Sequence, residues 1–288
     1  MSQDRLDASL DIDRRSTLEI VRLIQEQDAL VAPAVAAEAE RIAHAVDEIT
    51  NRLFHGGRMF YVGAGTSGRI AMLDAAELPP TFGIDGSLVR VLIAGGEGAF
   101  FNAVEGAEDD EETAIAAIEK EVVADDAVVG IAASGTTPYT VAAIRKANML
   151  GALTVGVTSV SGSPLAQEAD IAIVPQTGPE VIMGSTRMKS GTAQKLVLNT
   201  LSTAVMIRLG HVYSNLMIDM PATNEKLRNR AVQMVELVAE VPRPIAVQAL
   251  REANGNVKLA TIIAKKRVSP DEARRLLDGR KLREVLEA

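Results

Sequence analysis

The chain has no cysteine, no tryptophan and few other aromatic residues. Among its 288 residues Cys and Trp are absent, and aromatic residues make up only 3%. Without Cys there can be no disulfide, no thiolate metal site and no cysteine nucleophile, and the composition is compatible with a reducing compartment. Because 47% of the residues are nevertheless hydrophobic, we expect a core made mainly of Ala, Val, Leu and Ile.

The sequence also lacks apolar runs long enough for a membrane span and an excess of basic residues. No apolar run approaches the length of a membrane span, and the charged start of the chain, MSQDRLDASLDIDRRST, is unlike a signal peptide. The formal net charge of −8 argues against a nucleic-acid partner. We therefore expect a soluble cytoplasmic protein that binds neither membrane nor nucleic acid.

Residues 58–83, RMFYVGAGTSGRIAMLDAAELPPTFG, combine a strand, a glycine turn and a helix. Residues 59–62 are typical of a short strand, and residues 69–78 of a helix that Pro79 and Pro80 should stop. The turn between them holds three glycines, which let backbone N–H groups approach an anion, and two hydroxyl donors: Gly63, Gly65, Gly68, Thr66 and Ser67. The turn predicts phosphate binding, with packing alone as the alternative.

The same glycines satisfy the dinucleotide fingerprint G-x-G-x-x-G. That site also needs an acidic residue at the end of the following strand, to bind the ribose. Here the following strand ends in Gly95 and Gly96, and Asp85 precedes the strand. A dinucleotide site is therefore the weaker interpretation.

Five short apolar runs are spaced as strands that alternate with helices. They are residues 58–63, 88–94, 127–133, 152–158 and 171–175. This spacing predicts an α/β fold: a three-layer, doubly wound sandwich around a five-stranded parallel sheet, whose ligands bind at the carboxyl ends of the strands.

The third of these runs leads into a second hydroxyl-rich turn. Ser134, Thr136 and Thr137 follow it and precede a helix over residues 139–150. Any one of them could simply cap the helix. Two such turns on neighbouring strands favour a pocket for a phosphomonoester, and the lysine of a nucleotide triphosphate loop is absent.

A third polar segment, GSTRMKSGT at residues 184–192, should open a long helix that ends at Leu209. We expect Ser185 or Thr186 to cap it. Arg187 and Lys189 then lie in its first turn, where two cations oppose the helix dipole. An anionic ligand or a nearby carboxylate would offset that unfavourable placement.

The chain is expected to have three parts. Residues 1–56 form helices that pack on the core or on a second copy, residues 57–240 form the α/β domain with the phosphate-binding turns, and residues 241–288 form a small helical bundle. The bundle follows the linker VPRP and contains three helical patterns, at residues 245–253, 257–266 and 270–277. It carries eleven Lys/Arg against six Asp/Glu, and we assign no chemistry to it.

Spacing alone singles out no catalytic group. Glu77 ends a helix as an ordinary exposed carboxylate would, and Glu108 lies within an acidic run that is typical of a solvated helix start. The histidines, His44, His55 and His211, lie far apart in the sequence, so that neither a metal cluster nor a catalytic triad is indicated.

Three strings resemble a known family. They are GAGTSGRIAMLDAAELPPTFG, VEGAEDD at residues 104–110, and GSTRMKSGTAQKLVLNTLST at residues 184–203. Together they resemble the N-acetylmuramic acid 6-phosphate etherases, members of the sugar-isomerase (SIS) domain superfamily, and the likeness covers nearly the whole chain. The final helices look like the ubiquitin-associated-like tail of that family. One departure is Leu78, where many members have Cys.

The resemblance implies a lyase without metal or cofactor that removes D-lactate from N-acetylmuramic acid 6-phosphate during peptidoglycan recycling. It implies that Glu77 is the proton donor and Glu108 the second catalytic carboxylate. The expected substrate-binding residues are Gly65, Thr66, Ser67, Ser134, Thr136, Thr137, Ser185 and Lys189. An aldose–ketose isomerase and a non-catalytic sugar-phosphate sensor remain alternatives.

Helix length adds an expectation about assembly. Glu77 lies nine residues beyond Gly68, about 13 Å along a straight helix. A sugar phosphate is shorter than this, so we expect a homodimer in which Glu77 of one subunit completes the site of the other.

Overall fold

The computed structural model describes residues 4–102, 104–222 and 224–288. The chain divides into two compact units: Met1–Ala76 with Gly86–Val205, and Glu77–Asp85 with Met206–Ala288. Each unit has its own apolar core. Within the described residues, no helix is both long and apolar enough to cross a membrane.

The first unit contains the predicted five-stranded parallel sheet. Its strands are β1 (Met59–Gly63), β2 (Val89–Ile93), β3 (Ala127–Ile131), β4 (Leu153–Val157) and β5 (Ile171–Ile173). Their order is β2-β1-β3-β4-β5, and all neighbours are parallel. Since the chain steps outward from β1 to β2 and then returns to β3 on the other side, the β1–β3 junction is the point where ligands bind in such sheets.

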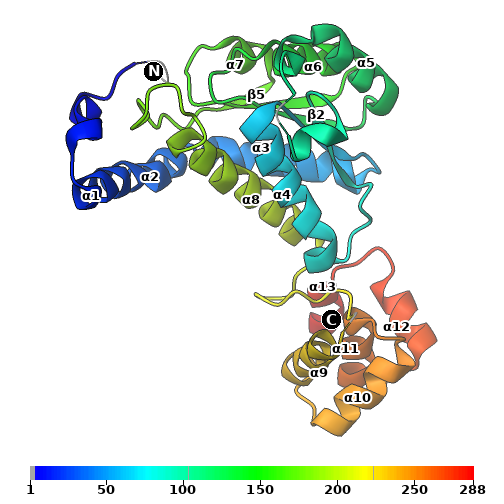
Figure 1. Ribbon diagram of the computed structural model, residues 1–288. Helices are drawn as coiled ribbons and strands as arrows, with labels where there is room; N and C mark the ends of the chain where they lie inside the picture. The colour runs from blue at the N-terminus through cyan, green and yellow to red at the C-terminus, as the bar shows by residue number, and fades with distance from the viewer. Residues whose placement is uncertain (1–3, 103, 223) are drawn as a thin grey trace. The chain divides into compact units, whose positions relative to one another are not determined.

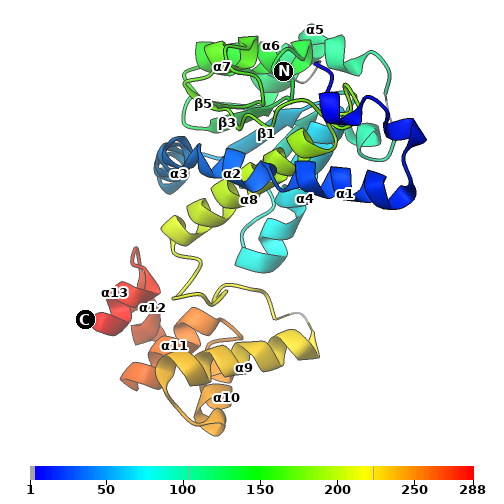
Figure 2. The same ribbon diagram turned by 90° about the vertical axis from the view of Figure 1, so that its left-hand side faces the viewer.

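Helices cover both faces of the sheet, as Figures 1 and 2 show. One face carries α5 (Glu111–Glu121), α6 (Pro138–Met149) and α7 (Pro164–Glu168), and the other carries α3 (Ala39–Phe54), α4 (Gly65–Phe82) and α8 (Lys189–Leu209). Alternate strand residues supply the two cores: Phe60, Val62 and Val128 belong to the α5–α6–α7 side. The three-layer doubly wound sandwich is confirmed.

Further short helices complete this unit. At the N-terminus they are η1 (Asp7–Ser9), η2 (Ile12–Arg14), α1 (Thr17–Asp28) and α2 (Val31–Ala36), and after β2 they are η3 (Glu97–Phe100) and η4 (Ala107–Asp109). Beside edge strand β5, the Glu38 carboxylate accepts the Val174 N–H at 3.0 Å and the Arg41 guanidinium donates to Ala172 O at 3.4 Å. The residues at the start of α3 thereby satisfy backbone groups at the open edge of the sheet.

Helix α4 differs from the prediction at both ends. It begins at Gly65 rather than residue 69, and it continues through Pro79 and Pro80 to Phe82. Proline φ angles suit a helix, although each proline lacks the N–H and its ring crowds the carbonyl four residues earlier. The Gly83 N–H closes the helix on Pro79 O at 2.9 Å. The prediction that the proline pair stops the helix was therefore wrong.

The second unit is a helical bundle to which the end of α4 belongs. Its helices are α9 (Glu225–Ala239), α10 (Arg243–Glu252), α11 (Val257–Lys266), α12 (Pro270–Leu277) and α13 (Leu282–Glu287). Helix α9 packs on α10 and α11, so the compact unit begins at Met206, whereas the expected third part began at residue 241. The three helical patterns expected in the tail are present, and α13 is an additional helix that the sequence patterns did not predict.

Candidate functional site

The first hydroxyl turn lies directly after β1, at the start of α4. Gly65 has a φ of +52° and no atom within 4 Å of the position a Cβ would take, so the backbone here is open as well as left-handed. Thr66 and Ser67 occupy the first helical turn, where backbone N–H groups have no helical acceptor and the dipole favours an anion. No acidic side chain lies in that turn.

The other two glycines of the turn serve packing. A Cβ on Gly68 would lie 2.6 Å from Ile93 Cγ1, and one on Gly63 would lie 3.1 Å from both Gly68 N and Ile131 O. Helix α4 can approach β1 and β2 only because both side chains are absent. The packing alternative thus accounts for Gly63 and Gly68, and Gly65 is the glycine whose backbone is left open.

The second hydroxyl turn follows β3, which pairs directly with β1. The Ser134 hydroxyl accepts the Thr136 N–H at 3.2 Å and the Thr136 hydroxyl proton at 2.9 Å. Gly135, with a φ of +67°, lies so close to Ser163 that a Cβ would be 2.1 Å from its Oγ. Thr137 is the N-cap of α6 but makes no side-chain capping bond. The two turns therefore lie at the same edge of the sheet, on neighbouring strands.

The third polar segment is capped by a residue that the sequence patterns did not identify. Helix α8 begins at Lys189, and the buried Glu180 carboxylate accepts the N–H groups of Lys189 and Ser190, each at 3.0 Å. The expectation that Ser185 or Thr186 caps this helix was wrong. Arg187 lies before the helix begins, so of the two cations only Lys189 is in its first turn. Glu180 is the nearby carboxylate that offsets this unfavourable placement, since it places a negative charge at the positive end of the helix.

Lys189 itself is buried, with 1% of its surface exposed. Its ammonium donates to Gln27 Oε1 of α1 at 2.8 Å. Burial lowers the pKa of Lys189, and the charges of Glu180 and Asp28 partly oppose that shift. The side chain is thus directed toward α1, while Ser185 is half-buried in the turn that precedes α8.

The first turn and α8 meet through side chains. The Ser67 hydroxyl donates to Gln194 Oε1 of α8 at 3.0 Å, in a buried contact. A Cβ on Gly191 would lie 3.8 Å from Thr66 Cγ2. Sequence reasoning missed Gln194, although a signal was present: it is a polar residue on the helical face that also carries the buried Leu198 and Leu201.

The two candidate carboxylates are exposed. Glu108 lies in η4, which packs against α6. Burial, with a smaller contribution from the charge of Asp110, raises the pKa of Tyr139 at the start of α6, so this acidic segment lies close to the helix that the second hydroxyl turn opens. Glu77 lies on α4 between the buried Ala75 and Leu78, in the part of the helix that belongs to the second unit.

A buried polar network holds α4 and α8 to the sheet. The Asp74 carboxylate accepts the Tyr61 hydroxyl at 2.8 Å, the Asn199 amide at 2.5 Å and the Ser202 hydroxyl at 3.0 Å. Burial and the neighbouring carboxylate raise the pKa of Tyr61 well above its usual value. This network fixes the strand and both helices that carry the first turn and Gln194.

The histidines take separate places in the fold. His211 Nδ1 pairs with Asp219 Oδ2 at 2.8 Å, and that oxygen also accepts Lys258 Nζ at 2.5 Å. His55 Nδ1 contacts Asn51 O at 2.8 Å. No group of three His, Cys, Asp or Glu residues that could hold a metal occurs in the described part of the chain.

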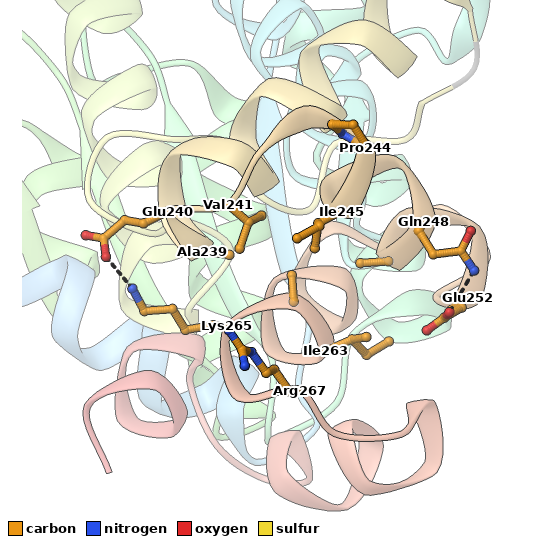
Figure 3. A pocket seen from close by; sticks show the side chains of 12 residues that line it. Ala239, Glu240, Val241, Pro244, Ile245, Gln248, Glu252, Ile263, Lys265 and Arg267 are labelled. Carbon is orange, nitrogen blue, oxygen red and sulfur yellow. Dashed lines mark hydrogen bonds and ion pairs between the residues drawn. The ribbon is translucent and has the colours of Figure 1, made fainter.

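A large hollow lies elsewhere, in the helical bundle. It has a volume of about 730 Å³ and is lined by residues of α9, α10 and α11 (Figure 3). Its floor is apolar, and pairs of polar side chains, Glu240 with Lys265 and Gln248 with Glu252, lie at its rim. None of the residues expected to bind substrate lines it.

Comparisons with known proteins show which family contains the chain. The profile of the glucokinase regulatory protein N-terminal SIS domain matches residues 41–148, and the SIS domain profile matches residues 100–204. Among solved structures, a phosphoheptose isomerase from Francisella tularensis is similar in fold, with a TM-score of 0.53 and 20% identity over 66% of this chain and 98% of that one.

Two curated relatives are much closer in sequence. The N-acetylmuramic acid 6-phosphate etherase of Symbiobacterium thermophilum is 59% identical over 91% of this chain and 87% of the relative. That of Clostridium beijerinckii is 49% identical over 97% of this chain and 92% of the relative. With relatives this similar over nearly its whole length, the chain belongs to the N-acetylmuramic acid 6-phosphate etherase family.

Proposed function

We propose that this protein cleaves the D-lactyl ether of N-acetylmuramic acid 6-phosphate, giving N-acetylglucosamine 6-phosphate and D-lactate in peptidoglycan recycling. The observation that carries the proposal is 59% identity, over 91% of the chain, to a protein named as this etherase. Two hydroxyl turns on the neighbouring strands β1 and β3 support it, because they suit a small phosphomonoester.

An alkyl ether leaves poorly unless the neighbouring carbon is activated. In the ring-opened sugar, the carbonyl acidifies the proton on carbon 2, so that a base can remove it while lactate leaves carbon 3. Water then adds to the unsaturated aldehyde. Each half-reaction needs one base and one acid, and two carboxyl groups can exchange these roles without a metal or a cofactor.

Glu77 and Glu108 are the two carboxyls that we assign to this chemistry, which makes the enzyme a carbon–oxygen lyase of the hydro-lyase type. Both side chains are exposed, so each can reach a solvent-borne substrate. Gly65, Thr66, Ser67, Ser134, Thr136 and Thr137 would hold the phosphate end, with Ser185 in support from the turn before α8. Lys189, whose ammonium is buried against Gln27, would contribute only by holding the start of α8 in place.

Two other functions would use the same phosphate turns. An aldose–ketose isomerase would share the enolising base but release no lactate. A sugar-phosphate sensor is favoured by the match to the glucokinase regulatory protein profile, but such sensors look like tandem sugar-phosphate domains. This chain has one set of turns and retains both Glu77 and Glu108.

Release of D-lactate from N-acetylmuramic acid 6-phosphate separates the etherase from both alternatives. Glu77→Gln should reduce turnover by roughly a hundredfold to ten-thousandfold, because it removes a general acid–base group, and should leave binding of N-acetylglucosamine 6-phosphate unchanged. Glu112→Gln, which alters another exposed carboxylate, is the matched control and should keep full activity. Lactate release by Glu77→Gln at the wild-type rate would refute the assignment.

Assembly and location complete the proposal. Helix α4 runs unbroken from Gly65 past Glu77, so the nine residues after Gly68 still span about 13 Å. We therefore propose a homodimer in which Glu77 acts on the substrate held by the partner. We also propose that the enzyme works in the cytoplasm, because the charge of a phosphorylated sugar keeps it from crossing a membrane unaided.

A further inference from the structure

Gln194 is a buried polar residue with one satisfied and one unsatisfied end. Only 2% of its surface is exposed. Its Oε1 accepts the Ser67 hydroxyl proton at 3.0 Å, while its Nε2 is buried and has no hydrogen-bond partner among the residues that the structure describes. A buried donor without a partner costs about 1–3 kcal/mol, so the amide at this position is unfavourable for stability in the absence of a ligand.

The proton of Ser67 is committed in this arrangement. A serine hydroxyl has one proton to donate and two lone pairs that accept. While the proton points to Gln194 Oε1, Ser67 presents only lone pairs to an anion at the start of α4, and these repel phosphate oxygens. Ser67 can donate to phosphate and keep its hydrogen bond to Gln194 only if Gln194 turns its amide and offers Nε2 to the serine oxygen.

The two amide orientations differ little in energy. In either orientation one end of the amide pairs with Ser67 and the other end remains unpaired, and the oxygen and nitrogen ends have nearly the same shape. A ligand that binds one of two nearly equal states more tightly shifts the population toward that state. An anion beside Ser67 would therefore determine which way the amide faces.

The neighbouring helix start cannot take the anion in place of α4. Glu180 already occupies the positive end of α8, where it accepts the N–H groups of Lys189 and Ser190. The first turn of α4 has no acidic residue. Of the two helix starts near Gln194, that of α8 is already capped by the Glu180 carboxylate. The start of α4 has no such carboxylate and can bind an anion.

We infer that Gln194 is a positioning residue for sugar-phosphate binding: its amide reverses when the phosphate arrives, Nε2 then donates to Ser67 Oγ, and the Ser67 hydroxyl donates to the phosphate. This inference rests on the proposed function only for the identity of the sugar phosphate. It assigns to Gln194 a role in binding, and none in the proton transfers at carbons 2 and 3.

Two substitutions of similar size test the inference. Gln194→Glu introduces a side chain that only accepts when ionised, and it should hold the Ser67 proton permanently. At a pH of about 8, where a carboxyl is normally ionised, binding of N-acetylglucosamine 6-phosphate and of inorganic phosphate should weaken by about tenfold to a hundredfold. Gln194→Met frees the hydroxyl but supplies no donor to Ser67 Oγ, so it should weaken binding by only about threefold to tenfold, less than Gln194→Glu does.

Kinetics and pH distinguish positioning from a purely structural role. Gln194→Glu should raise KM with little change in kcat, because the phosphate lies away from the reacting carbons. Relative to wild type, its affinity should recover as the pH falls, since the protonated carboxyl regains a donor. Equal weakening by Glu and Met, or unchanged binding in Gln194→Glu, would overturn the inference.

A measurement on the unmodified protein guards against variants that fail to fold. The side-chain amide resonances of Gln194, assigned by their absence in Gln194→Met or, if that variant is unfolded, by sequential assignment, should shift when N-acetylglucosamine 6-phosphate is added. Resonances that stay in place at saturation would overturn the inference, as would failure of the wild type to bind either phosphate compound. If the wild type shows the binding pattern but releases no lactate, the etherase proposal fails and the role of Gln194 stands.

Discussion

At the level of single residues, the start of α8 is held by two buried charges. The Glu180 carboxylate accepts both first N–H groups of the helix, and the ammonium of Lys189 lies buried against Gln27. Removing a charge from water is unfavourable unless partners compensate it. The hydrogen-bond partner of the Lys189 ammonium is uncharged, and burial outweighs the opposing charges of Glu180 and Asp28, so the pKa of Lys189 is lowered.

This burial predicts a pH dependence of stability. The pKa of Lys189 is lowered below 10.5 in the folded chain, whereas the unfolded chain keeps the ordinary value. Between the two values the unfolded chain binds more protons, so the free energy of unfolding should rise with pH in that window. Urea unfolding at a series of alkaline pH values should show this rise in the wild type and lose it in Lys189→Met.

Lys195→Met is the matched control for that experiment. Lys195 lies on the same helix, and its side chain is exposed, so its removal should leave the pH dependence unchanged. If Lys189→Met retained the wild-type slope, Lys189 would not be the group responsible.

Among the helices and strands, the end of α4 depends on a glycine. Gly83 has a φ of +64°, and a Cβ there would lie 2.1 Å from Asp219 O. The Asp219 carboxylate in turn pairs with His211 Nδ1 and with Lys258 Nζ. The turn that ends the helix is therefore pressed against a backbone that other contacts already hold in place.

Gly83→Ala should destabilise the protein by about 2 kcal/mol or more, since it combines a left-handed backbone with a clash against a carbonyl. Chemical denaturation measures the change. Gly86→Ala is the control: Gly86 has no atom within 4 Å of its Cβ position and no positive φ, and its substitution should change stability by at most about 0.5 kcal/mol. A Gly83→Ala variant as stable as Gly86→Ala would contradict this account.

Element boundaries show where local sequence was a good guide and where it was not. The five strands lie within the apolar runs that predicted them, because a buried parallel strand needs a continuous apolar segment. The predicted cap of α8 and the predicted end of α4 were wrong because each depends on tertiary structure. Glu180 supplies the α8 cap, and burial of Leu78 and Phe82 in the folded chain carries α4 through its prolines.

For the molecule as a whole, the proposed dimer makes a sharp prediction about mixed subunits. Glu77→Gln removes one carboxylate. Thr66→Asp puts a negative charge into the phosphate turn, at a helix start that tolerates acidic residues, so each variant alone should be inactive. If the site is shared, refolding the two in equal amounts should restore about one quarter of wild-type lactate release, since half of the dimers are mixed and each holds one intact site.

A second mixture, of Glu77→Gln with Glu108→Gln, shows which subunit supplies Glu108 to the site. If Glu108 acts on substrate held by its own subunit, that mixture should also recover activity. No recovery in the mixture of Glu77→Gln with Thr66→Asp, with mixed dimers demonstrated by mass spectrometry, would place Glu77 in the site of its own subunit.

Local patterns of apolar residues, glycines and hydroxyls were enough to predict the α/β class, the five parallel strands, the two hydroxyl turns and the family resemblance. Three further results needed the folded chain: Gly63 and Gly68 serve packing, Glu180 caps α8, and Gln194 holds Ser67. Each of these results rests on a contact that lies outside any local pattern. Such a contact exists only once the sheet has set its strand order and the helices have packed against it.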